Sequence, residues 1–206
     1  MGMLTIKSNF SDYYDTTAKT YNVPSAPDKV YDRNTHLYIH KSQSIQFLKA
    51  LGVNTIKLIP VSQLGVYDND VVVYLDDTLH GGQGKIVVSA QVALRDFSNC
   101  VCTHYYPDVC MTYKVLWVGE KRYNVSFKKN HQGNVEQFDL GEISDITTLT
   151  PAYHKKIHIP IYSIGYIETP NEMIATDFNE VQNLQKLSIN TVLKPEDVIS
   201  ELIKTL

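Results

Sequence analysis

Strand-like hydrophobic patterns outnumber helical ones along the chain. Residues 71–75 read Val-Val-Val-Tyr-Leu, a continuous apolar run that predicts a central strand buried on both faces. Residues 113–118 and 121–128 are β-prone segments on either side of Gly119-Glu120, which predicts a β-hairpin with a tight turn. Shorter strands are predicted at residues 4–8, 30–33, 37–40, 54–60 and 85–90.

Three further segments are less regular. Residues 157–167 form a long β-prone run, but Pro160 and Gly165 interrupt it, which predicts an edge strand or a bulge. Residues 91–99 fit a strand or a helix equally well. Residues 130–150 are the most polar stretch and predict a long loop.

Three helices are predicted, each with a start or stop signal. The central one covers about residues 42–51, where apolar side chains recur at helical spacing and Gly52 is a natural stop. A short N-terminal helix, preceded by a serine, is predicted over about residues 12–21. An amphipathic C-terminal helix over about residues 195–206 begins with a proline. The predicted fold class is therefore α+β, mostly β-sheet, in a single domain of residues 1–206.

The composition is that of a chain able to bury a core. Of its 206 residues 43% are hydrophobic and 20% are charged, which argues against disorder of the whole chain. The net charge of −3 argues against a dedicated duplex binder, which normally has a strong basic excess. No stretch approaches the roughly 20 apolar residues that span a bilayer, and the N-terminus lacks a signal-peptide pattern. The predicted location is the cytosol, with no membrane contact.

Tyrosine is enriched, at 14 of the 206 residues. Because tyrosine favours strands, a β-rich fold accounts for the excess. Tyrosine also gives large, rigid, amphipathic contact surface, which predicts a binding face instead. Tyr105, Tyr106 and Tyr123 lie near the basic residues 121–129, a combination that suits stacking of single-stranded nucleic acid. The acidic net charge makes nucleic acid the least favoured partner.

A cluster of cysteine and histidine is the candidate metal site. Cys100, Cys102, His104 and Cys110 form a C-x-C-x-H-x5-C pattern of thiolate and imidazole ligands, the types that zinc prefers. Alternatively, residues 100, 102 and 104 share one face of a strand, where cysteine is a small core residue. The odd number of cysteines fits reduced thiols better than disulfides. Apart from this structural zinc, no cofactor is expected.

Two other patterns resemble binding motifs without meeting their requirements. The pair His36 and His40, like the pair His154 and His158, is four residues apart, which in a strand is about 13 Å and too far for one metal ion. Residues 80–85 read His-Gly-Gly-Gln-Gly-Lys and resemble a phosphate loop in composition. They lack the Walker spacing and precede a strand, so a hairpin loop is predicted.

Both ends of the chain resemble one family of small tailed-phage proteins. Residues 8–15 read Ser-Asn-Phe-Ser-Asp-Tyr-Tyr-Asp, and residues 30–33 read Val-Tyr-Asp-Arg. Residues 183–187 and 195–203 are similar to that family's closing segment and helix. The family also has a central strand that carries a cysteine, a glycine and a tyrosine. Its counterpart here, residues 116–123, keeps the glycine and the tyrosine but has no cysteine. The resemblance implies a phage protein in the cytoplasm of the host bacterium, and it implies no mechanism.

The leading functional prediction is a non-enzymatic, phage-encoded accessory protein that binds a host protein, a phage protein or a small ligand in the infected bacterial cell. It follows from the lack of a catalytic motif, the tyrosine content and the phage resemblance. One alternative is an enzyme acting on nucleotides or nucleic acid through a metal ion held by aspartates. Another is a single-stranded nucleic-acid binder. The predicted binding residues are Tyr13, Tyr14, Asp32, Arg33, Tyr105, Tyr106 and Tyr123.

Overall fold

The computed structural model describes residues 2–7, 19–23, 29–32, 40–78, 84–119, 121–129, 135–139, 157 and 161–179. In these ranges the strands are β1 (Gly2–Lys7), β2 (Lys19–Val23), β3 (Lys29–Asp32), β4 (Asp70–Tyr74), β5 (Lys85–Ser89), β6 (Val101–His104), β7 (Met111–Val118), β8 (Lys121–Lys129), β9 (Val135–Asp139), β10 (Ile161–Glu168) and β11 (Met173–Asn179). The helices are α1 (Lys41–Ala50), α2 (Val61–Leu64) and α3 (Ala90–Asp96). The fold is α+β and mostly β-sheet, which confirms the predicted fold class.

The described strands form three sheets. The largest is antiparallel, with five strands in the order β11-β10-β7-β8-β9, and a smaller antiparallel sheet has the order β5-β4-β6. Strand β1 pairs antiparallel with β2 and parallel with β3. None of the helices in the described ranges is long and apolar enough to cross a membrane.

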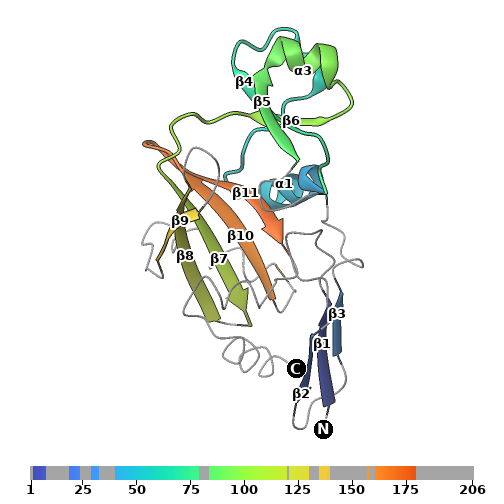
Figure 1. The fold of residues 1–206 in the computed structure, drawn as a ribbon, viewed down its shortest axis with the longest axis vertical. Helices are drawn as coiled ribbons and strands as arrows, with labels where there is room; N and C mark the ends of the chain where they lie inside the picture. The colour runs from blue at the N-terminus through green and yellow to red at the C-terminus, as the bar shows by residue number, and fades with distance from the viewer. Residues whose placement is uncertain are drawn as a thin grey trace.

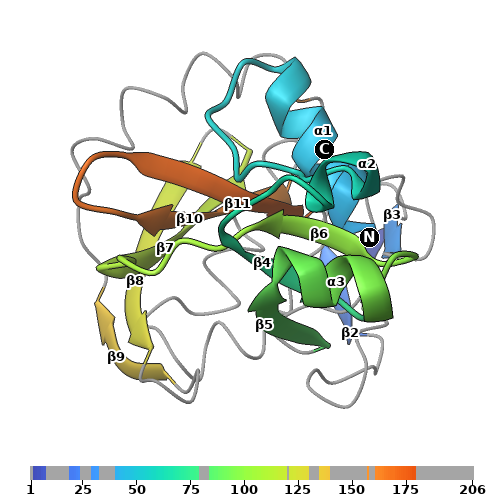
Figure 2. The same cartoon turned by 90° about the horizontal axis from the view of Figure 1, so that it is seen from above.

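Residues 61–104, comprising the small sheet with α2 and α3, form a small lobe. Helix α1 lies between this small lobe and β11, the edge strand of the five-stranded sheet (Figure 1). Viewed from above, the small lobe lies on the β11 side of the large sheet, away from β8 and β9 (Figure 2). The two antiparallel sheets therefore meet through α1 and through residues 54–59, whose backbone groups pair with both β11 and β6.

Several predicted elements are confirmed. Helix α1 matches the predicted central helix, and Gly52 follows it at φ 86°, a left-handed conformation that favours glycine. Strand β4 is central in the small sheet, with Val71 and Val73 fully buried. Strands β7 and β8 form the predicted hairpin, and Gly119 in their turn has a φ of 55°.

Strand pairing overrides the local signals in two places. Residues 19–21, predicted as the end of a helix, belong to β2, because β2 forms an antiparallel ladder with β1. The rest of that predicted helix and the predicted helix at residues 195–206 lie outside the described residues. Residues 135–139, predicted as part of a loop, form β9, whose backbone groups pair with those of β8.

The β-prone run at residues 157–167 corresponds to β10, which lies inside the large sheet and not at its edge. The prediction was an edge strand or a bulge, and the edge position does not apply because β10 pairs with both β7 and β11. The predicted bulge is confirmed, since the register with β11 shifts between Gly165 and Tyr166.

The remaining ambiguous segments are settled by the structure. Residues 90–96 are helix α3, and Ser89 caps it by accepting a hydrogen bond from the Val92 N–H at 3.3 Å. The predicted strand at residues 54–60 is an extended segment with isolated pairings at Thr55 and Leu58 only. Of the predicted strand at residues 37–40 only His40 is described, and it precedes α1.

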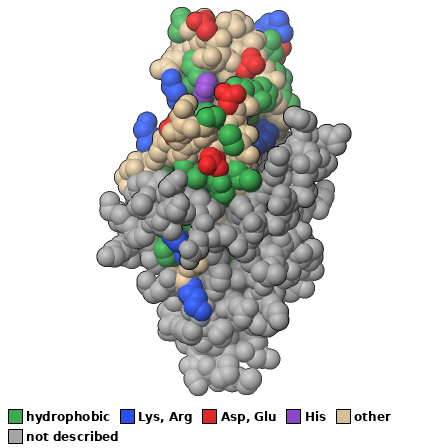
Figure 3. All heavy atoms as spheres, turned by 90° about the vertical axis from the view of Figure 1, so that its left-hand side faces the viewer, with side chains coloured by type: hydrophobic (Ala, Val, Ile, Leu, Met, Phe, Trp, Pro, Cys, Tyr) green, Lys and Arg blue, Asp and Glu red, His purple; other side chains and the backbone are tan. Residues whose placement is uncertain are grey.

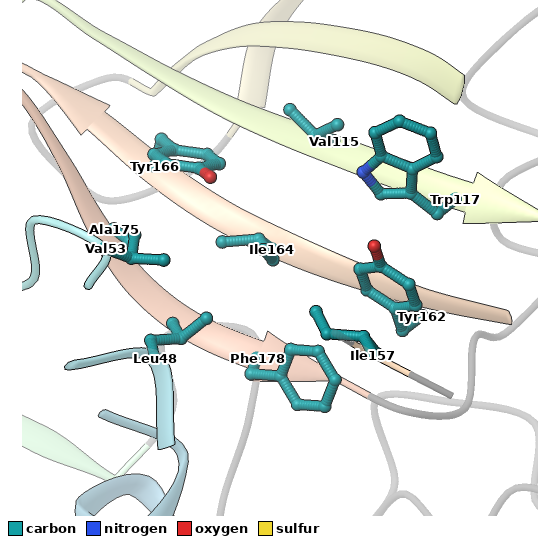
Figure 4. Close-up of a cluster of buried hydrophobic side chains, with 10 residues drawn as sticks. All are labelled: Leu48, Val53, Val115, Trp117, Ile157, Tyr162, Ile164, Tyr166, Ala175 and Phe178. Carbon is teal, nitrogen blue, oxygen red and sulfur yellow. The ribbon is translucent and has the colours of Figure 1, made fainter. Parts of the chain in front are cut away.

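A row of aromatic rings crosses the large sheet and ends on α1. Trp117 of β7 stacks on Tyr162 of β10 with ring centroids 6.4 Å apart, and Tyr162 contacts Phe178 of β11 at 5.4 Å. Phe178 in turn lies 4.9 Å from Phe47 of α1. Figure 4 shows Trp117, Tyr162, Phe178 and Leu48 within one buried cluster. Such pairs contribute about 0.5–1.5 kcal/mol each beyond their buried area, so the row holds α1 against the sheet.

The outer edge of β11, which pairs with no other strand of the large sheet, is covered by α1 and by the segment after it. The Ser44 Oγ, buried in α1, accepts a hydrogen bond of 2.8 Å from the Phe178 N–H. The Ala175 N–H donates to the Asn54 carbonyl at 2.8 Å, and the Ile56 N–H donates to the Ala175 carbonyl at 2.9 Å. A covered edge cannot template unwanted pairing, and here its hydrogen bonds also position the start of α1.

One face of the small sheet packs against α3, and Lys41 of α1 reaches Tyr74 on the other face. Val71, Val73 and Cys102 are buried against the alanines of α3. Because side chains alternate along a strand, the residues between them point to the opposite face. This opposite face carries Val72, Tyr74, Lys85, Val87, Val101 and Thr103.

Removal of the Ser44 hydroxyl tests how α1 is anchored. In Ser44→Ala the Phe178 N–H stays buried without its acceptor, so the free energy of unfolding should fall by about 1–3 kcal/mol. Ser62→Ala, at an exposed position of α2, is the control and should change it by less than about 0.5 kcal/mol. Urea denaturation followed by circular dichroism measures both. Equal stability of the two variants would contradict the anchoring role.

Candidate functional site

Charged and aromatic side chains from three elements converge where α1 meets the two sheets. The Lys41 Nζ, at the start of α1, lies 3.8 Å from Asp177 Oδ2 of β11 and 5.6 Å from the ring centroid of Tyr74, at the end of β4. The Lys41 and Asp177 side chains are 14% and 23% exposed, so water screens their attraction only in part. One ammonium group thus joins both sheets.

A β-bulge sets the direction of Asp177. Gly165 pairs with Asp177 and Tyr166 with Ala175, which leaves Thr176 as the extra residue of β11. The Asp177 carboxylate accepts hydrogen bonds from the Thr176 hydroxyl at 3.2 Å and from the Asn179 side-chain amide at 3.1 Å. Two hydrogen-bond donors and the Lys41 ammonium group therefore hold the carboxylate in one place.

Gly165 provides the space that this carboxylate occupies. A Cβ at position 165 would overlap Asp177 Oδ1 and would lie 3.0 Å from the Thr176 Oγ1. Gly165 also pairs with Lys114 of β7, so Lys114, Gly165 and Asp177 form one row across three strands. Neighbouring strands are about 4.8 Å apart, and paired residues share a face. In this row Gly165, which has no side chain, therefore lies between Lys114 and Asp177.

The small sheet contributes a second lysine. Lys85 of β5 pairs with Tyr74 of β4, so Lys85 lies beside Tyr74 on the face opposite α3. Lys41 approaches the same ring from α1. The Lys41 ammonium group thus lies over Tyr74, and Lys85 is the cross-strand neighbour of Tyr74.

Asp77, three residues after the end of β4, binds the start of α1. Its backbone carbonyl accepts the Lys41 N–H at 2.8 Å. Its carboxylate lies 2.8 Å from His40 Nδ1 and accepts a hydrogen bond from the Ser42 hydroxyl at 3.2 Å. The exit of β4 and the first turn of α1 are therefore tied together.

The neighbouring Asp76 shapes the turn that leads to Asp77. Its Oδ1 accepts hydrogen bonds from the Thr78 backbone N–H at 2.9 Å and from the Thr78 hydroxyl at 2.6 Å. These bonds, the side-chain one above all, hold the pKa of the Asp76 carboxyl below its ordinary value. The turn therefore stays fixed while its aspartate is charged.

A second cluster lies where β6 leaves the small lobe. The Tyr67 hydroxyl is hydrogen-bonded to His104 Nδ1 at 2.7 Å, and Tyr106 meets the His104 ring edge-on with centroids 4.5 Å apart. The Lys57 Nζ lies 5.4 Å from the centroid of the Tyr67 ring. Burial, and secondarily the charge of Lys57, lower the pKa of His104. Burial raises the pKa of both tyrosines, so all three groups favour their neutral forms.

The predicted binding residues that are described lie on separate elements. Tyr105 and Tyr106 lie in the segment between β6 and β7, and Tyr106 packs in the cluster with His104. Asp32 ends β3, and Tyr123 pairs with Leu116 in the β7–β8 ladder. Tyr13, Tyr14 and Arg33 lie outside the described residues. On the face seen in Figure 3, acidic, basic and hydrophobic side chains of the described residues are interspersed.

The four predicted zinc ligands occupy different surroundings. Cys102 is buried in the core of the small lobe, with Cys100 packed at its margin. His104 is bound to Tyr67, and Cys110 is exposed before β7. Among the described residues, no group of three or more histidine, cysteine or acidic side chains is arranged to hold a metal ion. This placement agrees with the alternative reading of Cys102 as a small core residue.

The histidine and glycine patterns can be followed in part. His40 binds Asp77, while His36, His154 and His158 lie outside the described residues. Gly84 has a φ of 63° and opens β5, and its carbonyl accepts the Leu75 N–H at 2.7 Å. Strands β4 and β5 are antiparallel neighbours, and residues 79–83 between them lie outside the described residues.

The site residues Lys41, Asp77 and Asp177 were not singled out together from the sequence. They lie on three elements that are far apart along the chain, and no short motif contains them. One local signal does exist. Helix α1 begins with a lysine and has no acidic residue in its first turn, although a helix N-terminus favours negative charge. A cation at that position indicates either a partner acid or an anionic ligand.

Comparison with known proteins reveals a shared fold. No protein-family model and no curated protein matches the chain. Among solved structures it is similar to N5-carboxyaminoimidazole synthetase from Staphylococcus aureus complexed with ADP, with a TM-score of 0.60 and 9% identity over 77% of this chain and 48% of that one. It is similar to D-alanine–D-alanine ligase from Bacillus anthracis complexed with ATP, with a TM-score of 0.59 and 11% identity over 85% of this chain and 68% of that one. It is also similar to an ATP-grasp ligase complexed with a minimal precursor, with a TM-score of 0.60 and 12% identity over 81% of this chain and 59% of that one.

These likenesses show that the chain shares its fold with these synthetases and ligases. The chain spans about half the length of the synthetase that it matches. The predicted function, a phage accessory protein acting by binding, is contradicted by this set of neighbours, which are a synthetase complexed with ADP, a ligase complexed with ATP and an ATP-grasp ligase. It was inferred from the lack of a contiguous motif, but side chains on α1, β4 and β11 meet only after folding. The resemblance to phage proteins remains a prediction.

The lowered pKa of His104 predicts a pH-dependent stability. The unfolded chain binds a proton at this residue more readily than the folded chain, so the free energy of unfolding should decrease as the pH falls below about 6.5. In His104→Gln this part of the decrease should be absent. Urea denaturation at about pH 7.5 and 5.5 gives the change for each protein. An identical pH-dependent change in both proteins would show that His104 does not contribute.

Proposed function

We propose that this chain binds ATP and forms the nucleotide-binding part of an ATP-dependent ligase. The fold supports this, because similar structures are a synthetase complexed with ADP and a ligase complexed with ATP. The site supports it independently. Lys41 stands between the two sheets, and Lys85 is placed beside Tyr74 on the small sheet.

The lysines suit the phosphates of a nucleotide. The start of α1 presents the positive end of a helix dipole, where an anion is stabilised. Lys41 adds a full charge there and is held near Tyr74 and Asp177. A phosphate bound at this point neutralises a cation that the helix dipole disfavours. This position of Lys41 is the observation that carries the proposal.

Tyr74 and Thr103 are buried on the small-sheet face opposite α3, but the exposed part of this face suits the base. It presents Val72 and Val87 as paired apolar side chains, and Val87 is 48% exposed. A planar heterocycle lying on this face would cover apolar surface beside Tyr74, while its phosphates extend towards the lysines. The arrangement fits a ligand with one apolar end and one anionic end.

The residues present also fit a magnesium ion bound together with the nucleotide. Magnesium is usually held by one or two carboxylates together with substrate phosphates, so a complete set of protein ligands is not needed. The Asp177 carboxylate and the Asn179 side chain supply oxygen atoms on β11, close to Lys41. When bound, the ion would neutralise charge on the phosphates. The chain itself orients the Asp177 carboxylate through the bulge, Thr176 and Asn179.

The phosphate-binding role of Lys41 is tested by Lys41→Gln. The variant lacks the ammonium group, so the Kd for ATP should rise by about tenfold or more. Lys49→Gln, in the exposed last turn of the same helix, is the matched control and should leave the Kd unchanged. Isothermal titration calorimetry with ATP and magnesium measures both variants. If the unaltered chain does not bind ATP, or if Lys41→Gln binds ATP as tightly as the control, the proposal is wrong.

The role of Asp177 is tested by its dependence on magnesium. Asp177→Asn keeps the shape of the side chain but removes its charge, so the magnesium concentration for half-maximal ATP binding should rise by about tenfold. Asp68→Asn, an exposed aspartate of the small lobe, serves as control. A magnesium titration at constant ATP gives the value. If both variants need the same magnesium concentration for half-maximal ATP binding, Asp177 does not belong to the site.

A further inference from the structure

We propose that Asp77 is a positioning residue that holds the ammonium group of Lys41 in the geometry needed for a nucleotide phosphate. The inference rests on the proposed ATP-binding function and assigns a role that the fold alone does not. Asp77 acts through the first turn of α1 and not by contact with the ligand.

Helix α1 lacks the usual means of fixing its own start. Its N-cap residue, His40, makes no side-chain capping bond, and the first turn has no acidic residue. Asp77 supplies the missing partner from the exit of β4. Its carbonyl accepts the Lys41 N–H, which would otherwise be one of the unpaired donors of the helix start.

The contacts of Asp77 bracket Lys41 along the chain. The residue before it, His40, and the residue after it, Ser42, both bind the Asp77 carboxylate. The backbone of Lys41 is therefore fixed at its own N–H and on both sides. A lysine side chain loses up to about 2 kcal/mol of conformational freedom when it is held in one place. Because its backbone is already fixed, Lys41 has less conformational freedom left to lose when the ligand binds.

The same helix is fixed to the large sheet three residues further on. There Ser44 accepts the Phe178 N–H. The first turn of α1 is thus bonded to the small sheet by Asp77 and to β11 by Ser44. Lys41 lies between these two attachments, within reach of Tyr74 and Asp177. Loss of Asp77 would release one attachment and leave the other.

The carboxylate of Asp77 is not itself suited to contact a phosphate. Its two oxygens are directed at His40 and Ser42. A negatively charged group would also repel a phosphate at short range. Asp77 is therefore expected to act only through Lys41, and this makes the inference separable from a general loss of structure.

A double-mutant cycle on the full chain tests this dependence. The four proteins are the unaltered chain, Asp77→Ala, Lys41→Met and the double variant, and the Kd is measured for ATP with magnesium and for adenosine. Asp77→Ala should raise the Kd for ATP by about tenfold and change that for adenosine by less than about twofold. In the Lys41→Met background the same change should alter the Kd for ATP by less than about twofold.

The control is Asp70→Ala, at the exposed start of β4, which should bind ATP like the unaltered chain. Should Asp77→Ala not fold, Asp77→Asn enters the same cycle, because it removes the charge and preserves the size of the side chain. Equal losses for ATP in both Lys41 backgrounds, equal losses for ATP and adenosine, or no loss at all would overturn the positioning role. Absence of ATP binding by the unaltered chain, or ATP binding unaffected by Lys41→Met, would instead overturn the proposed function and this inference with it.

Discussion

The buried hydrogen bond from the Phe178 N–H to Ser44 Oγ joins the two parts of the molecule on which the site depends. It uses the open edge of β11, and the contact between Phe47 and Phe178 continues the same attachment through side chains. Because α1 is held at this edge, its first residue, Lys41, reaches both Asp177 of the large sheet and Tyr74 of the small sheet. A shift of α1 along β11 would move Lys41 away from both.

The irregularity of β10 and β11 has a clear structural consequence. In a regular strand, Ala175 and Phe178 would point to opposite faces, since three positions separate them. The extra residue Thr176 brings both into the same core while Asp177 remains paired with Gly165. The glycine then leaves room for the carboxylate. Bulges are frequent next to active sites because they redirect one side chain without disrupting the sheet.

The candidate groups are not contiguous in the sequence, and this is why no short motif pointed to the proposed nucleotide site. The Walker loop and similar motifs hold their chemistry in one short segment. Here the candidate groups are spread over α1, β4, β5 and β11, and each is ordinary in its local sequence. The lysine at the start of α1 is the one local departure, because the helix dipole disfavours a cation there. Because a single fold carries many activities, the assembled site and not the fold defines the activity.

Sequence by itself determined the elements whose signals are local: helix α1 with Gly52 after it, the β7–β8 hairpin, the buried strand β4 and the bulge near Gly165. Hydrophobic periodicity and glycine conformation act over a few residues, and they can be read from the chain directly. Tertiary structure alone decided that β10 lies inside its sheet, that residues 19–21 are strand, and that Lys41, Tyr74 and Asp177 meet. These outcomes depend on pairing and packing between segments up to 136 residues apart, as from Lys41 to Asp177, and no local pattern encodes such contacts.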